Sequence, residues 1–228
     1  MSAGDAAGDG QREDPRYGGL GPGPLAILDK VRKPRPAARP GERCDMCGVD
    51  IADEHSHVVN LDDRALMCTC RPCRLLFSHE GAARGRFRAV PERWAKLADF
   101  RLSAGQWESL QVPVSVAFFF ENSTNDQVAA FYPSPAGATE SLLALDTWTE
   151  IASANPELST LTPDVEALLV RVGADREAEG YIVPIDACYE LVGLLRKHWK
   201  GFDGGTEAHA ALDDFFARAR ERASPTRR

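Results

Sequence analysis

A group of cysteines constrains this chain more than any other feature. Five of its six cysteines lie between residues 44 and 73. Four of them form two C-x-x-C pairs, Cys44 with Cys47 and Cys70 with Cys73, and 22 residues separate the pairs. Two such pairs at this spacing are typical of a site in which four thiolates hold one metal ion. We therefore predict a metal-binding ribbon over residues 42–80.

The chain between the two pairs fits the same prediction. The segments "HSHVVNL" and "ALMCT" can pair as a β-hairpin around "DDR", which would bring the two pairs side by side. Gly48 supplies the small residue that favours a tight turn after the first pair, whereas Arg74 follows the second pair. A module of this size is too small to fold on a hydrophobic core alone, so the ion would stabilise it.

The spacing does not settle the identity of the metal. Four thiolates describe a zinc ribbon, and they also describe a rubredoxin-type iron site. Zinc is favoured because the aromatic packing and the two glycine-bearing turns expected around a redox iron are not evident. Four thiolates close the coordination shell and leave no position for water, which indicates a structural rather than a catalytic ion.

Other residues near the pairs are weaker ligand candidates. Strand alternation puts Cys68 on the same face as Cys70, so Cys68 could compete as a ligand or lie beside the site; we interpret it as a small buried hydrophobe. Alternative ligands are His55, His57 and His79, which we interpret as surface or strand histidines. The sixth cysteine, Cys188, falls on the apolar side of a predicted helix and is assigned to the core.

Composition and charge limit the function classes. The start of the chain has no apolar run typical of a signal peptide, and no later run approaches the ~20 residues that span a bilayer. We predict a flexible leader over residues 1–41 and a cytoplasmic protein, a compartment in which clustered cysteines are metal ligands more often than disulfides. The net charge is −7, and this argues against general nucleic-acid binding. The region 30–96 is nevertheless net basic.

The rest of the chain predicts an α+β fold. Residues 81–112 read as a bridging segment, with a capping box at Ser103 and Gln106. Residues 113–222 predict an α+β domain with an antiparallel sheet. Strands are expected over 113–120, 127–132, 164–172 and 181–184, and helices over 139–154, 185–199 and 206–222.

An offset of 51 residues superposes strand, turn, strand, proline, helix and tryptophan in two halves of this domain. A strand-strand-helix duplication would give one sheet with helices packed on one face. The same reading makes residues 133–140 a loop that enters a helix capped by Thr139. Because free amides at a helix start can hold an anion, the loop is a candidate anion or ligand site. Its residues are Ser134, Gly137, Ala138 and Thr139.

Several stretches together resemble a bacterial family of unknown function. They are "CDMCG…CTCRPC", "PVSVAFFF", "AFYPSPAGATESLL", "DVEALLV" and "PIDACYELVGLLRKHWKGF". The likeness covers about residues 42–220. Members of that family tend to be encoded beside nickel–iron uptake hydrogenase genes, so the resemblance implies an accessory role in assembling or serving a hydrogenase. Rubredoxin-like proteins also occur in such gene clusters, which raises the iron alternative. The resemblance carries over no catalytic residue.

The function expected from the sequence is that of a non-enzymatic accessory protein. It would carry a structural four-cysteine zinc site and bind a protein partner, such as a hydrogenase subunit. A rubredoxin-like iron electron carrier is the alternative. A weaker alternative is nucleic-acid binding through "KVRKPRP" and the arginines at positions 71, 74, 84, 86 and 88. An enzyme with its site at residues 133–140 is the least favoured reading.

Overall fold

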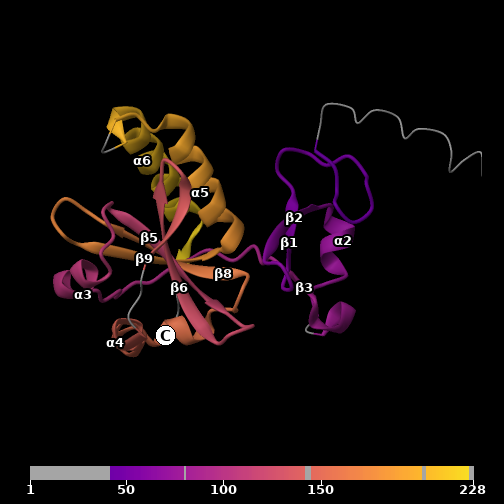
Figure 1. Ribbon diagram of the computed structural model, residues 1–228, viewed down its shortest axis with the longest axis horizontal. Coiled ribbons are helices and arrows are strands. Elements are labelled where there is room, and N and C mark those ends of the chain that lie inside the picture. Colours follow the sequence, from indigo (N-terminus) through magenta and orange to yellow (C-terminus); the bar gives the residue numbers. More distant parts are fainter. Residues whose placement is uncertain (1–41, 80, 142–144, 202–203, 226–228) are drawn as a thin grey trace, which may run out of the picture. The chain divides into compact units, whose positions relative to one another are not determined.

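A computed structural model of the protein describes residues 42–79, 81–141, 145–201 and 204–225. The leader predicted over residues 1–41 lies outside the described residues. From residue 42 onward the chain forms one compact unit, which contains two sheets (Figure 1). For reference, residues 42–90 are called the cysteine module and residues 91–225 the sheet module.

The cysteine module contains β1 (Ser56–Asn60), β2 (Ala65–Thr69), α2 (Arg71–Leu75), the 3-10 helix η1 (Ala82–Gly85) and β3 (Phe87–Ala89). The sheet module begins with β4 (Ala95–Lys96), α3 (Ala104–Ser109), β5 (Val116–Asn122), β6 (Gln127–Ser134) and β7 (Gly137–Ser141). It continues with α4 (Leu145–Ala154), the 3-10 helix η2 (Pro156–Thr160), β8 (Glu166–Val172), β9 (Ala178–Pro184), α5 (Ile185–His198), α6 (Gly205–Arg222) and β10 (Ser224–Pro225).

The small sheet of the cysteine module has the order β2-β1-β3, with both pairs antiparallel. Strands β1 and β2 form the predicted hairpin. Its turn is held by side chains, since Asn60 Oδ1 accepts from the N–H of Asp62 at 3.2 Å and Asp63 Oδ1 accepts from the N–H of Ala65 at 3.0 Å. Polar turn residues that bond to nearby amides favour such a reversal, so the hairpin prediction is confirmed.

The large sheet has the order β10-β4-β9-β8-β5-β6-β7. Its neighbouring strands are antiparallel except β10 and β4, which are parallel. The bridging segment predicted over residues 81–112 contributes β3 to the small sheet and β4 to the large one. Its capping box is present, because Ser103 Oγ accepts from the N–H of Gln106 and Gln106 Oε1 accepts from the N–H of Ser103.

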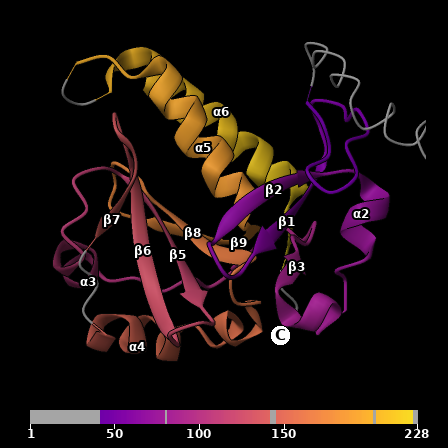
Figure 2. The same ribbon diagram turned by 45° about the vertical axis from the view of Figure 1, so that its right-hand side comes forward.

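Helices cover both faces of the large sheet, so the prediction that they pack on one face is wrong. On one face Phe118 packs in a core with residues of α5 and α6, including Leu191 and Phe216. On the other face the next residue, Phe119, packs with Ile151 of α4. Figures 1 and 2 show α5 and α6 on one side of the sheet and α4 on the other. The continuous apolar runs of β5 and β8 are the physical reason, because strands buried on both faces do not alternate.

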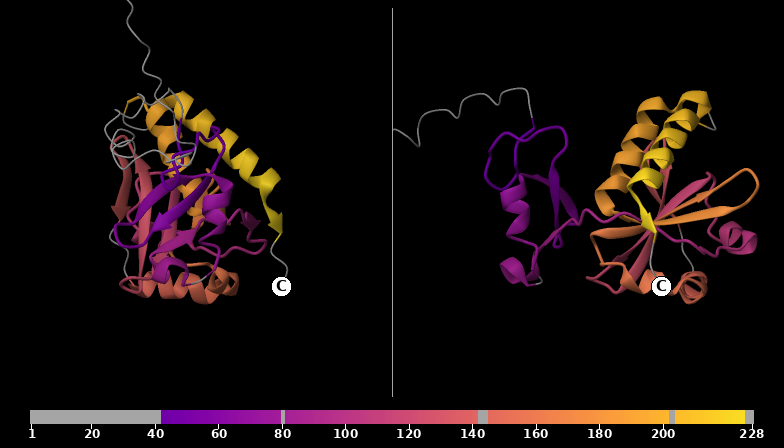
Figure 3. Two further views of the ribbon diagram at one scale, coloured as in Figure 1. Left: turned by 90° about the vertical axis from the view of Figure 1, so that its right-hand side faces the viewer. Right: turned by 180° about the vertical axis from the view of Figure 1, so that it is seen from behind.

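The offset of 51 residues holds for strands but not for helices. Hairpin β5–β6 corresponds in this way to hairpin β8–β9, and α5 follows β9 directly (Figure 3). After β6, however, the chain forms strand β7 before α4 begins at Leu145. The helix predicted over residues 139–154 is therefore wrong in its first part. Strand β7 pairs with the outer edge of β6, from Ala130–Ser141 to Ser134–Gly137, and this pairing satisfies backbone groups that an edge strand would expose.

Candidate metal centre

The first cysteine pair lies in a tight turn of the backbone. Gly48 N–H donates to the carbonyl of Cys44 at 2.8 Å, and Cys44 N–H donates to the carbonyl of Val49 at 2.9 Å. Gly48 has a φ of +75°, a left-handed conformation that glycine adopts without steric cost. The turn thus explains why a glycine follows the first pair, as the sequence suggested.

The second pair uses a helix instead. Cys70 is the N-cap of α2, and Arg74 N–H donates to its carbonyl at 3.0 Å. Proline falls at the start of the helix, where it is well tolerated. A helical turn brings residues i and i+3 to one side, so Cys70 and Cys73 converge without a left-handed residue after them. This accounts for Arg74 at the position where a glycine was expected.

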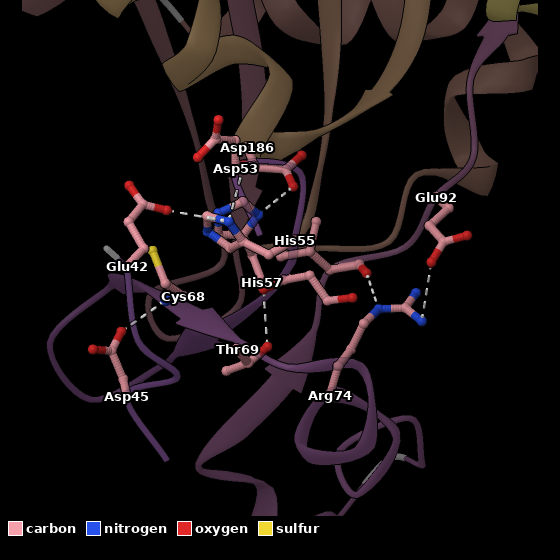
Figure 4. Close-up of polar contacts among 12 residues, drawn as sticks. Glu42, Asp45, Asp53, His55, His57, Cys68, Thr69, Arg74, Glu92 and Asp186 are labelled. Atoms are coloured by element: carbon pink, nitrogen blue, oxygen red, sulfur yellow. Dashed lines mark hydrogen bonds and ion pairs between the residues drawn. The ribbon is translucent and has the colours of Figure 1, made fainter. Parts of the chain in front are cut away.

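Asp45 connects the first turn by hydrogen bonds to the strand that leads into the second pair. Its backbone N–H donates to the carbonyl of Cys68 at 2.8 Å, and its Oδ2 accepts from the N–H of Cys68 at 2.7 Å (Figure 4). Because Cys68 is two residues before Cys70, the two bonds hold the pairs next to each other. Asp45 is a positioning residue that the sequence analysis did not single out.

The four sulfur atoms of Cys44, Cys47, Cys70 and Cys73 all lie within 4.8 Å of one another. The Sγ atoms of Cys47 and Cys70 are 3.7 Å apart. A tetrahedral ion with metal–sulfur bonds of ~2.3 Å would separate its sulfur ligands by ~3.8 Å. The structure therefore brings together the four residues that the spacing predicts, in a geometry that fits one tetrahedral ion. That they hold an ion stays a prediction.

The protein environment shifts the pKa values of Cys44 and Cys73 in opposite directions. Cys44 is only 2% exposed, and burial by itself raises its pKa. Backbone hydrogen bonds from Cys70, Cys47 and Met46 outweigh burial and lower the pKa of Cys44 to about 6. The pKa of Cys73 is raised, chiefly by its hydrogen bond to the Cys70 side chain and by burial. Cys44 is therefore more ready than Cys73 to act as a thiolate ligand.

A second group of side chains that could hold a metal ion lies in the same module. The ligand atoms of His55, His57 and Cys68 are within 4.8 Å of one another (Figure 4). Cys68 thus groups with the histidines rather than with the four cysteines. Burial raises the pKa of the Cys68 thiol, and the negative charges of Asp45 and Glu42 raise it further.

From the sequence, Cys68 is interpreted as a small buried hydrophobe and the histidines as surface or strand residues, with a place in or beside the four-cysteine site as the alternative. The signal that would have grouped them is the hairpin register. His55 and His57 share a face because they are two residues apart in extended chain. Residue 57 pairs directly with residue 68 across the hairpin. Register is set by the turn and the burial pattern, and the spacing of histidines and cysteine alone does not reveal it.

The anion site was predicted in a loop that leads into a helix, and the structure has a strand in place of the start of that helix. Residues 137–141 form strand β7, so no helix begins at Thr139 to offer free amides. The two hydroxyl groups bond to each other, Thr139 Oγ1 to Ser134 Oγ at 2.8 Å, and Ser134 Oγ also accepts from the N–H of Ala136 at 3.1 Å. Ser134 ends β6, and Gly137, Ala138 and Thr139 begin β7, so these residues flank the turn between the two strands.

Fold and site together define an α+β protein with mainly antiparallel sheets and a four-cysteine cluster that could hold a metal ion. Residues 43–223 match a family of unknown function (DUF5947), and the chain belongs to that family. Neither the curated proteins nor the solved structures contain a match to the chain. Among the residues that the structure describes, no helix combines the length and the apolar character needed to cross a membrane.

Proposed function

We propose that this chain is a non-enzymatic accessory protein whose four-cysteine cluster holds a structural zinc ion. The convergence of the four sulfur atoms within 4.8 Å is the observation that supports it. When bound, the ion would be held by Cys44, Cys47, Cys70 and Cys73. It would cross-link the first turn, the end of β2 and α2. Since four thiolates leave no open coordination position, this ion would order the module rather than act on a substrate.

A protein surface next to the site supports an interaction role. Leu75 and Leu76, at the end of α2, are 55% and 68% exposed. Adjacent exposed leucines are costly in water and are a feature of protein-binding surfaces. In this proposal α2 presents them to a protein partner, and the ion fixes the start of α2. The resemblance to a family encoded beside hydrogenase genes makes a nickel–iron hydrogenase subunit the first partner to test.

Metal analysis of the purified protein tests the structural role. We expect zinc, and we expect the variant Cys47→Ser/Cys70→Ser to lose one equivalent that Cys188→Ala keeps. Cys188 is a matched control because it is a buried cysteine outside both clusters. Iron in place of zinc, with a visible absorption spectrum, would overturn the structural role and favour a rubredoxin-like electron carrier. The exposure of Cys47 supports that alternative, because an exposed ligand offers a route for electrons.

Affinity capture tests the interaction role. The tagged wild-type chain should retain a hydrogenase subunit from an extract of its native host. The variant Leu75→Ser/Leu76→Ser should lose that subunit while keeping its zinc, which would show that the module is still folded. Equal retention by both chains would remove α2 from the proposed interface.

A further inference from the structure

We propose that His55, His57 and Cys68 form a second metal site, separate from the four cysteines and with an incomplete set of protein ligands. The site would take a borderline-soft first-row dication such as Zn²⁺, bound through two imidazole nitrogens and one thiolate. This inference goes beyond the proposed function because it uses different residues and a different coordination chemistry.

The hairpin places the three side chains on one face. His57 lies at the start of β1, His55 directly precedes that strand, and Cys68 lies opposite His57 on β2. Neighbouring residues across an antiparallel pair have Cβ atoms about 4.5–5.5 Å apart. The paired backbone therefore fixes the spacing of the His57 and Cys68 donors before any ion binds, which lowers the entropy cost of binding.

Hydrogen bonds decide which nitrogen of His55 is free. Its Nδ1 lies 2.9 Å from the carbonyl oxygen of Ala52 and 3.1 Å from that of Asp53. A carbonyl oxygen can only accept, so Nδ1 carries the hydrogen and, in the neutral imidazole, Nε2 has the free lone pair. Bonds of this kind, from the second ring nitrogen to a backbone carbonyl, are usual for histidines that bind metals.

The Nε2 atom of His55 is buried and has no hydrogen-bond partner in the structure. The side chain as a whole is only 9% exposed. A buried polar atom without a partner destabilises the folded state, and native proteins seldom leave one so without a functional reason. A metal ion between this nitrogen, His57 and Cys68 would satisfy it.

His57 has the same arrangement with a carboxylate. Its Nδ1 lies 2.7 Å from Oδ2 of Asp186, in the first turn of α5 (Figure 4). Donation from Nδ1–H to the carboxylate leaves Nε2 of His57 available, and it makes that nitrogen a stronger donor to a metal. Carboxylate, histidine and metal are a recurring series in zinc sites. Asp186 is thus a positioning residue.

The donor set indicates the class of metal. A thiolate and two imidazoles suit Zn²⁺ and related transition metals, whereas Mg²⁺ and Ca²⁺ prefer oxygen ligands. Three protein ligands leave a fourth position for water or another small ligand, as in catalytic zinc sites. Both imidazoles and Asp186 line a cleft with a volume of about 1040 Å³. The two clusters therefore differ in kind, one closed by four thiolates and the other open.

Equilibrium dialysis of the full chain against Zn²⁺ tests the proposal. Wild type should bind two equivalents, and His55→Gln and Cys68→Ser should each bind one. The controls His79→Gln and Cys188→Ala should bind two, since neither residue belongs to a cluster. In Asp186→Asn the second equivalent should bind about 10–100-fold more weakly, as for other residues that orient a metal-binding histidine.

The two metal proposals can fail separately. The variant Cys47→Ser/Cys70→Ser tests the four-cysteine ion, whereas His55→Gln tests the second one. A wild-type chain that binds one equivalent, which is lost only in Cys47→Ser/Cys70→Ser, would overturn the second site and leave the first. A second equivalent that survives both His55→Gln and Cys68→Ser would also overturn it. If His55→Gln fails to fold, Co²⁺ spectra decide: Cys68→Ser should lose one set of cobalt–thiolate bands, and unchanged bands would contradict the proposal.

Discussion

The cysteine module and the sheet module bury very different interiors. In the cysteine module the buried apolar residues are few, and two of them, Cys44 and Cys73, belong to the four-cysteine cluster. In the sheet module large side chains such as Phe118, Phe119 and Leu168 are buried on both faces of one sheet. In the proposed function, one part of the chain is stabilised by an ion that cross-links it and the other part by the hydrophobic effect.

Residues of the cysteine module also pack into the larger hydrophobic core. Val59 and Val90 pack in the same cluster as Val165 of the sheet module. Arg88 of β3 donates to Asp164 at 3.0 Å. The edge of the small sheet is therefore anchored by burial and an ion pair, while the cysteine turns depend on the proposed ion. The comparison predicts that the two modules respond differently to the same perturbation.

Removal of the four-cysteine ion should have the largest effect. Structural zinc sites contribute apparent free energies of about 10–16 kcal/mol, so chelation or Cys73→Ser should unfold the cysteine turns and the β1–β2 hairpin. Hydrogen exchange should show lost protection in β1 and β2, with protection kept in β8 and β9. Equal loss of protection in both modules would show that the ion does not stabilise the cysteine module separately. Cys188→Ala is the control for loss of a buried thiol.

Truncating a buried side chain of the sheet module should lower the stability of that module and leave the metal content unchanged. Phe119 is fully buried and stacks on Trp148 of α4, with ring centroids 5.8 Å apart. We expect Phe119→Ala to lower the free energy of unfolding by about 3–5 kcal/mol, through lost burial and a cavity. Urea denaturation measures the change, and metal content should stay at the wild-type value. A loss of metal in this variant would mean that the core and the cysteine cluster fold as one.

The ion pair between Arg93 and Glu166 lies within the sheet module, close in sequence to the end of the cysteine module. Arg93 donates from Nε and Nη2 to the two carboxylate oxygens, both at 2.8 Å, and Glu166 is only 2% exposed. Arg93→Ala would leave a buried carboxylate without this partner, at a cost of about 2–3 kcal/mol. Thermal unfolding measures it. Arg93→Ala/Glu166→Gln should recover part of the loss, and no recovery would assign the cost to packing instead.

The smallest effect concerns Glu179 near the sheet edge. Burial alone would raise its pKa, but the hydrogen bond and charge of Lys96 and the charge of Arg220 lower it overall. A lowered pKa in the folded state stabilises the protein above the unfolded-state pKa of about 4.3, and this gain is lost as pH falls through the folded-state pKa. Glu179→Gln should cost about 0.5–1 kcal/mol at pH 7.

Acid unfolding curves of the two chains check the sign of this prediction. The stability difference between wild type and Glu179→Gln should shrink as the pH falls below about 4.3. A difference that does not change with pH would show that Glu179 contributes by packing or neutral hydrogen bonds rather than by its charge.

Local sequence patterns predicted much of this fold. The hairpin around residues 61–64, the capping box at Ser103 and the helices α5 and α6 follow from turn residues, caps and apolar spacing near in sequence. The wrong prediction concerns strand pairing, which depends on contacts that the local sequence does not show. Residues 139–141 read as the start of a helix in isolation, yet they belong to strand β7 at the edge of the sheet, and tertiary pairing outweighs local propensity.

The sequence by itself determined that four cysteines are paired for one site, since C-x-x-C spacing is a local property of turns. Only the tertiary structure decided that Cys68 lies with His55 and His57, and that Asp186, far along the chain, orients His57. The physical reason is that a one-residue change of register turns every side chain of a strand to the other face. Long-range contacts are set by the packing of the whole fold, and residue spacing does not encode them directly.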